Sequence, residues 1–139
     1  MTDLEQRIFA IAKDLQLINF ATASDGGKPN LRYVVGRADA TLTLRFSTHL
    51  DSNKVRQLRN NPNVCLTLGA NSVRSQSWLR VDGTAEVSTE GDERRTFWFD
   101  GLERYFGGVD DPRYCVVIVK PATIELGSMS TQPEVWRGH

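Results

Sequence analysis

The stretch INFATASDGGKPNLRYVV, residues 18–35, decides the fold, because it has the pattern of two strands joined by a tight turn. Strand-like runs at residues 18–22 and 31–35 flank Asp25-Gly26-Gly27, a combination typical of β-hairpin turns. This hairpin predicts that the chain continues as antiparallel strands.

Four more strands are predicted along the chain, three of them from alternating apolar and polar residues. In the first of them, Leu42, Leu44 and Phe46 alternate with polar residues. The others are predicted at residues 64–68, 79–87 and 114–119, the last continuing over 122–126 past Pro121. Six strands with turns between them, in so short a chain, favour a small closed or nearly closed β-barrel, although periodicity alone leaves a sandwich open.

Three helical segments are expected to flank the strands, which makes the predicted fold mainly β with flanking α-helices. A capping box at Thr2 and Glu5 starts an amphipathic helix over residues 3–15. A short helix is predicted from Ser52 to residue 60, before Pro62. An aromatic-rich stretch, residues 89–106, is predicted to be helical and broken near Gly101, its aromatic residues serving the core or a subunit interface rather than a cofactor.

Length and charge exclude several classes of protein. The chain has 139 residues, which fits one domain (1–139) with a C-terminal tail from about residue 128. Its 17 basic and 17 acidic residues cancel, which argues against general nucleic-acid binding. No apolar run approaches the roughly 18 residues that span a bilayer. The two cysteines lack CxxC spacing, and we expect no disulfide, no metal site, no membrane association and a cytoplasmic location.

A phosphate-binding pattern lies in residues 46–54. A strand ends in the hydroxyls of Ser47 and Thr48, and a helix starts at Ser52 with Lys54 in its first turn. Free amides at a helix start attract anions, and a bound phosphate would offset the unfavourable interaction of this lysine with the helix dipole. The alternative is an ordinary capped helix with a solvated lysine.

Arg32 is the second candidate ligand for an anion. It lies among apolar residues of the second strand, where a guanidinium must either find an anion or reach solvent. A bidentate phosphate contact and a surface-facing position both satisfy this requirement.

Together these segments resemble the pyridoxamine 5'-phosphate oxidase-related, FMN-binding split-barrel family, and most of all its short general stress protein branch. The resemblance covers roughly residues 4–126. It is carried by the order and spacing of Phe20-Ala21-Thr22, Gly27-x-Pro29-x-x-Arg32-x-Val34, Phe46-Ser47-Thr48, Ser52-Asn53-Lys54, Asn60-Asn61-Pro62-x-Val64, Val81-x-Gly83-x-Ala85 and Asp111-Pro112.

The resemblance implies a six-stranded split β-barrel that forms a homodimer and holds FMN in two clefts at the subunit interface. Arg32 and Lys54 would hold the phosphate, while the strand at residues 33–35 would run under the isoalloxazine. Asn53 stands where the oxidases often carry arginine, and Trp78 stands where they supply a glutamine to the ring. The implied cofactor-binding residues are Arg32, Tyr33, Val34, Val35, Ser47, Thr48, Ser52, Asn53, Lys54 and Trp78.

The function implied is that of an FMN-dependent oxidoreductase acting on a small substrate that the sequence does not identify. No catalytic residue is evident, and the C-terminus lacks the family's arginine-rich segment, so oxidation of pyridoxamine phosphate itself is not expected. A non-enzymatic flavin carrier or sensor is the first alternative. A barrel that binds the deazaflavin F420 or haem is the second, with His49 as weak support for haem.

Overall fold

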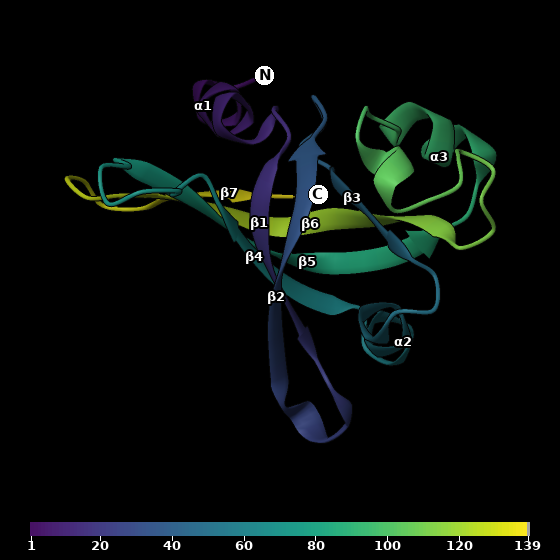
Figure 1. Ribbon diagram of the computed structural model, residues 1–139. Coiled ribbons are helices and arrows are strands. Elements are labelled where there is room, and N and C mark those ends of the chain that lie inside the picture. Colours follow the sequence, from purple (N-terminus) through teal and green to yellow (C-terminus); the bar gives the residue numbers. More distant parts are fainter. Residues whose placement is uncertain (139) are drawn as a thin grey trace.

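Seven strands form one antiparallel sheet in the computed structural model, which describes residues 1–138 (Figure 1). They are β1 (Gln16–Ala23), β2 (Pro29–Ala38), β3 (Leu44–His49), β4 (Asn63–Leu68), β5 (Ser77–Ser88), β6 (Tyr114–Ser128) and β7 (Glu134–Arg137). The order is β3-β2-β1-β4-β5-β6-β7, and β3 also pairs with β6. This pairing closes the first six strands into a barrel, which confirms the predicted fold class.

The inside of the barrel holds the larger of two apolar cores. Alternate residues of β1 and β3 point inward, as their burial patterns show, and Phe20 and Phe46 meet edge to face with ring centroids 4.6 Å apart. Both rings are fully buried. This packing accounts for the alternation on which the strand predictions rested.

The barrel is split between β2 and β3. These strands pair only over Gly36–Ala38 and Leu44–Phe46, whereas β3 pairs with β6 along its whole length. Gly36 permits the close approach, since a Cβ there would collide with the carbonyl oxygen of Arg45. Beyond this point β2 follows β1 into a projecting hairpin (Figure 1), so Val34 and Thr48 lie on separated strands.

The helices are shorter than the sequence pattern indicates. They are α1 (Asp3–Ala12), η1 (Asp25–Gly27), α2 (Asn53–Asn60), α3 (Gly91–Phe97) and η2 (Leu102–Arg104). The capping box of α1 is present, but the helix ends at Ala12 and not at residue 15. Leu42 adopts a positive φ of 66° in a turn, so the third strand begins at Leu44. The predicted break near Gly101 is confirmed, because its φ is 110°.

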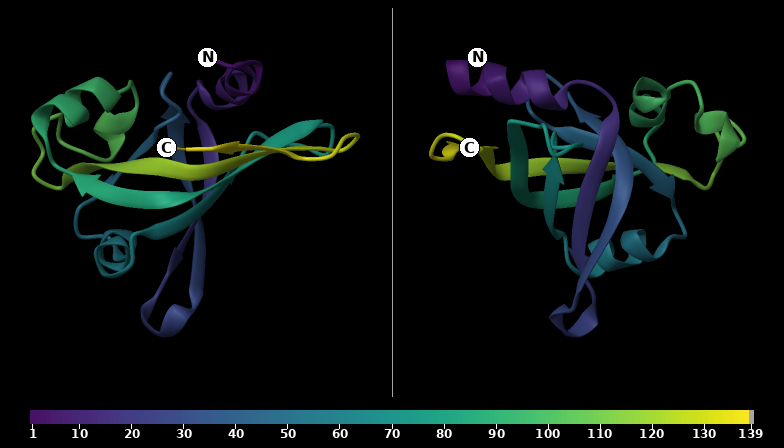
Figure 2. Two further views of the ribbon diagram at one scale, coloured as in Figure 1. Left: turned by 180° about the vertical axis from the view of Figure 1, so that it is seen from behind. Right: turned by 60° about the vertical axis from the view of Figure 1, so that its left-hand side comes forward.

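A second apolar core lies outside the barrel, beneath α3 and η2. It consists of Phe97, Leu102, Phe106, Tyr114, Val116 and Ile118. Figure 2 shows α3 and the segment that follows it standing beside the barrel, near the ends of β3 and β6. The aromatic-rich stretch therefore supplies core residues, as predicted.

Part of the C-terminal tail is a strand. Residues 134–137 form β7, which pairs with β6. The Trp136 indole donates a hydrogen bond to Glu5 Oε2 at 3.1 Å, and Arg7 Nη1 lies 2.6 Å from Glu134 Oε2. The tail is thereby held against α1. Among the described residues, no helix is long and apolar enough to cross a membrane.

Candidate functional site

The split between β2 and β3 opens into a hollow of about 450 Å³, within the ~300–1,000 Å³ range of small-molecule sites. Strand β2 contributes residues 33–35, and strand β3 contributes residues 47–49. Lys54 enters from the first turn of α2. The remaining lining residues are Leu17, Phe99, Gly101, Leu102, Arg104, Tyr105 and Phe106.

Lys54 is held inside this opening by a hydroxyl group. Its Nζ donates to Thr48 Oγ1 at 2.8 Å, and Thr48 is buried. The Ser52 hydroxyl lies 3.5 Å from the same oxygen. Burial lowers the pKa of Lys54, and the positive charge of Arg32 lowers it further.

Arg32 reaches the same end of the barrel from β2. Its Nη1 donates to Thr22 Oγ1 at 2.8 Å, and its Nη2 donates to Gln57 Oε1 at 3.1 Å. Gln57 follows Lys54 by three residues, so both lie on one face of α2. Burial lowers the pKa of Arg32 as well. The guanidinium does not line the hollow itself but stands close enough to repel the Lys54 ammonium.

Neither cation has a charged partner within residues 1–138. Arg32 and Lys54 are each partly buried and bonded only to neutral acceptors. Partly buried charges of one sign, placed near each other without a counter-charge, cost free energy. An anion bound between them would offset that cost, as the sequence pattern predicts for a phosphate.

The start of α2 is also open to an anion. Ser52 occupies the N-cap position, yet its hydroxyl makes no capping hydrogen bond. An ordinary N-cap serine would accept a bond from an amide of the first turn. The structure therefore disfavours the simple capped-helix interpretation of Ser52, and the amides of this first turn can still donate hydrogen bonds to an anionic ligand.

The structure brings together most of the predicted cofactor residues but not all of them. Six line the hollow: Tyr33, Val34, Val35, Ser47, Thr48 and Lys54. Ser52 adjoins it through Thr48, Arg32 lies behind it on Gln57 of α2, and Asn53 is exposed. Trp78 lines a different hollow of about 670 Å³, which shares only Leu17 and Tyr33 with the first.

The sequence did not reveal the wall of the hollow formed by residues 99–106, which we call the wall segment. Phe99, Tyr105 and Phe106 of this segment line the hollow, and His49 packs its ring 4.6 Å from that of Phe106. The aromatic residues of this stretch were the only signal in the sequence, and they were predicted to serve the core or a subunit interface rather than a cofactor. Gln57, which holds Arg32, carried no signal at all.

A comparison with known protein families shows to which family this chain belongs. The family described as pyridoxamine 5'-phosphate oxidase matches residues 4–127. The chain belongs to this family. General stress protein 26 of Bacillus subtilis (strain 168) is 29% identical over 125 residues, which cover 89% of this chain and 88% of that protein.

Solved structures of the family share the fold. General stress protein 26 from Bacillus anthracis str. Sterne superposes with a TM-score of 0.85 at 24% identity, covering 98% of this chain and 99% of that one. A pyridoxamine 5'-phosphate oxidase-related, FMN binding protein from Nostoc punctiforme has a TM-score of 0.66 at 15% identity, with coverage of 97% and 85%. A heme binding protein from Mycobacterium smegmatis has a TM-score of 0.73 at 17% identity, with coverage of 96% and 56%. The fold alone therefore does not choose the ligand.

Proposed function

We propose that this protein binds FMN in the hollow at the barrel split and acts as a flavin-dependent oxidoreductase on a small substrate. The observation that carries the proposal is the pair of partly buried cations, Arg32 and Lys54, that lack a counter-charge within the described residues. A phosphate dianion offsets both charges at once.

The other residues of the hollow fit the rest of the cofactor. Hydroxyl groups of Thr48 and Ser52 lie beside the Lys54 ammonium and can donate to phosphate oxygens. Within residues 1–138, residues 33–35 of β2 pair with no strand on the side of the split, so their backbone groups there are free to bind the polar edge of a flavin. The aromatic wall segment, with Tyr105 and Phe106, can cover a planar ring and exclude water.

Bound FMN would supply the electron or hydride transfer, while the chain supplies binding and orientation. Within the described residues, the lining of the hollow includes no carboxylate and one imidazole, that of His49. This scarcity of groups for proton transfer favours a flavin carrier or sensor as the second candidate function. The same imidazole makes haem the competing ligand.

Binding and turnover can be tested separately. Purified protein is titrated with FMN, riboflavin and haem, followed by flavin fluorescence and visible absorbance. We expect FMN to bind with quenched fluorescence, and more tightly than riboflavin because riboflavin lacks the phosphate. Exclusive haem binding would overturn the cofactor assignment. Anaerobic mixing with NADH or NADPH then separates an enzyme, whose flavin is reduced quickly, from a carrier, whose flavin stays oxidised.

We also propose that two copies of the chain assemble with the hollow at their interface. Leu17, Leu31 and Tyr33 on the outer face of β1 and β2 are 62%, 71% and 70% exposed, and the first and last of them line the hollow. Contiguous exposed apolar side chains are costly in water and typical of interaction surfaces. A second copy of the chain suits this face because it bears the same apolar surface.

Light scattering tests the dimer. The parent should show twice the 15.6 kDa of the chain, and Leu17→Glu should shift the mass to that of one chain. Val73→Glu is the matched control, since Val73 is fully exposed in the loop between β4 and β5. A parent that remains a single chain with ligand bound would contradict the proposal.

We further place the protein in the cytoplasm, because Cys65 and Cys115 are free thiols that suit a reducing compartment.

A further inference from the structure

The wall segment is not part of the barrel, although it forms one side of the hollow. It follows α3 and includes η2, and it rests on the second apolar core over the outer face of β6. Its position over the hollow therefore depends on what fixes α3 and η2 to the strands beneath.

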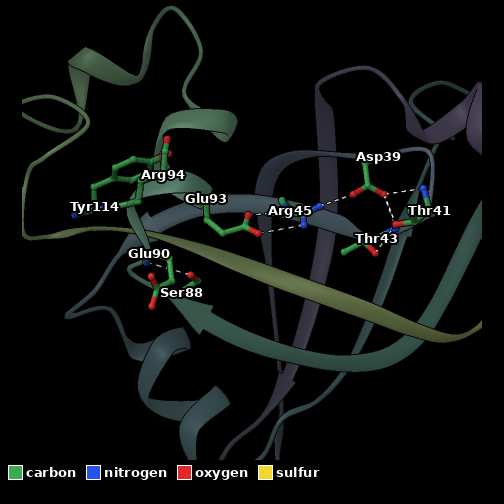
Figure 3. A network of polar contacts seen from close by, with 9 residues as sticks. All are labelled: Asp39, Thr41, Thr43, Arg45, Ser88, Glu90, Glu93, Arg94 and Tyr114. Carbon is green, nitrogen blue, oxygen red and sulfur yellow. Dashed lines mark hydrogen bonds and ion pairs between the residues drawn. The ribbon is translucent and has the colours of Figure 1, made fainter.

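An ion pair ties α3 to β3, the strand whose residues 47–49 line the hollow. Arg45 of β3 donates from Nε to Glu93 Oε2 at 2.8 Å and from Nη2 to Glu93 Oε1 at 3.3 Å (Figure 3). Its Nη1 donates to Asp39 Oδ2 at 2.6 Å, in the turn between β2 and β3. Arg45 precedes Ser47 by two residues, so both side chains lie on one face of β3.

The remaining polar contacts of this region lead to other elements. The Tyr114 hydroxyl donates to the carbonyl oxygen of Arg94 at 2.9 Å, which joins α3 to β6 (Figure 3). Arg94 Nη1 donates to the carbonyl oxygen of Asp111 at 3.3 Å. Within residues 1–138, the contact of Arg45 with Glu93 is the only hydrogen-bonded link from β3 to α3 or the wall segment.

The ion pair between Arg45 and Glu93 is partly buried, which strengthens it, yet dissolved ions can still reach it. The Arg45 and Glu93 side chains are 23% and 27% exposed, so water and salt screen them less than a surface pair. A neighbouring hollow of about 470 Å³ reaches both residues, and Lys13, Arg37 and Asp92 also line it. Dissolved ions can approach the pair through this hollow.

We propose that Arg45 and Glu93 are positioning residues, and that their ion pair holds the wall segment over the hollow and slows the release of the bound flavin. The proposal rests on the proposed function for the identity of the ligand. It predicts that removing the pair loosens the wall segment and accelerates the dissociation of the flavin.

The test compares two variants that each remove one carboxylate from the same arginine. Glu93→Gln removes the charge that ties Arg45 to α3. Asp39→Asn removes the charge that ties Arg45 to the β2–β3 turn, while its amide oxygen can still accept from Thr41 and Thr43. Dissociation of FMN is followed by the recovery of its fluorescence, and hydrogen exchange of peptides covering residues 97–106 is measured without ligand. We expect Glu93→Gln to release FMN about fivefold faster or more, with faster exchange in that segment. Asp39→Asn should change neither.

A double-variant cycle confirms that the pair acts as a unit. Adding Glu93→Gln to Arg45→Gln should have no further effect on the release of FMN. Unchanged exchange and release in Glu93→Gln, or equal effects in Asp39→Asn, would overturn the proposal. If the parent binds no flavin, the proposed function fails while the exchange measurement still decides whether the pair positions the wall.

Discussion

Replacing Lys54 with methionine should weaken FMN binding and, at the same time, stabilise the protein without ligand. Methionine keeps an unbranched side chain in the opening but removes the ammonium that donates to Thr48 Oγ1. The two effects have opposite sign because the charge is favourable only when an anion is bound.

The loss of affinity follows from the kind of bond removed. A hydrogen bond to a charged group contributes about 1.5–3 kcal/mol, which corresponds to a roughly 10- to 150-fold weaker Kd for FMN. The affinity for riboflavin, which lacks the phosphate, should change little. Fluorescence titrations with both ligands therefore separate a phosphate contact from general damage to the hollow.

The gain in stability comes from the partial burial of Lys54 and from its repulsion by Arg32, the two causes that lower its pKa. Because Lys54 is only partly buried, we expect the free energy of unfolding to rise by only about 0.5 kcal/mol, measured by urea unfolding. The unfolded chain keeps the lysine proton up to its ordinary pKa of 10.5. The parent should therefore gain stability as pH rises toward that value, and this component should be absent in the variant.

The control is Lys28→Met, which removes an exposed lysine from the hairpin turn. It should leave both the affinity for FMN and the stability unchanged. Equal losses for FMN and riboflavin in Lys54→Met, or an unchanged affinity for FMN, would refute the placement of the phosphate.

Three further changes have definite expected outcomes. Gly36→Ala should destabilise the fold by about 1–3 kcal/mol in urea unfolding, because the added Cβ would meet the Arg45 carbonyl oxygen, whereas Gly107→Ala has room and should not. Burial raises the pKa of Cys115 from 9.0 to about 11, so stability should fall as pH rises between those values, and a Cys115→Ala variant with the same slope would contradict this. Tyr105→Ala should weaken FMN and riboflavin alike, by about two- to tenfold in fluorescence titrations, because the wall contacts the ring and not the phosphate. A selective loss of FMN in Tyr105→Ala would argue that the phosphate lies at the wall instead.

The sequence determined the barrel and the position of the candidate anion site along the chain. Alternation in single segments is a local property, so Leu44 and Phe46 reveal a strand without knowledge of its neighbours. Ser52 and Lys54 likewise mark the start of α2, because a helix terminus creates its own unpaired amides.

Only the tertiary structure decided which distant residues meet. Arg32 and Lys54 share one end of the barrel because α2 packs there and Gln57 bonds to the guanidinium. Residues 99–106 form a wall of the hollow, Trp78 lines a separate hollow, and residues 134–137 form β7. Each of these outcomes depends on contacts between segments far apart in the chain. Such contacts depend on how whole elements pack and on the register of β6 with its neighbours, which no local pattern in the sequence encodes.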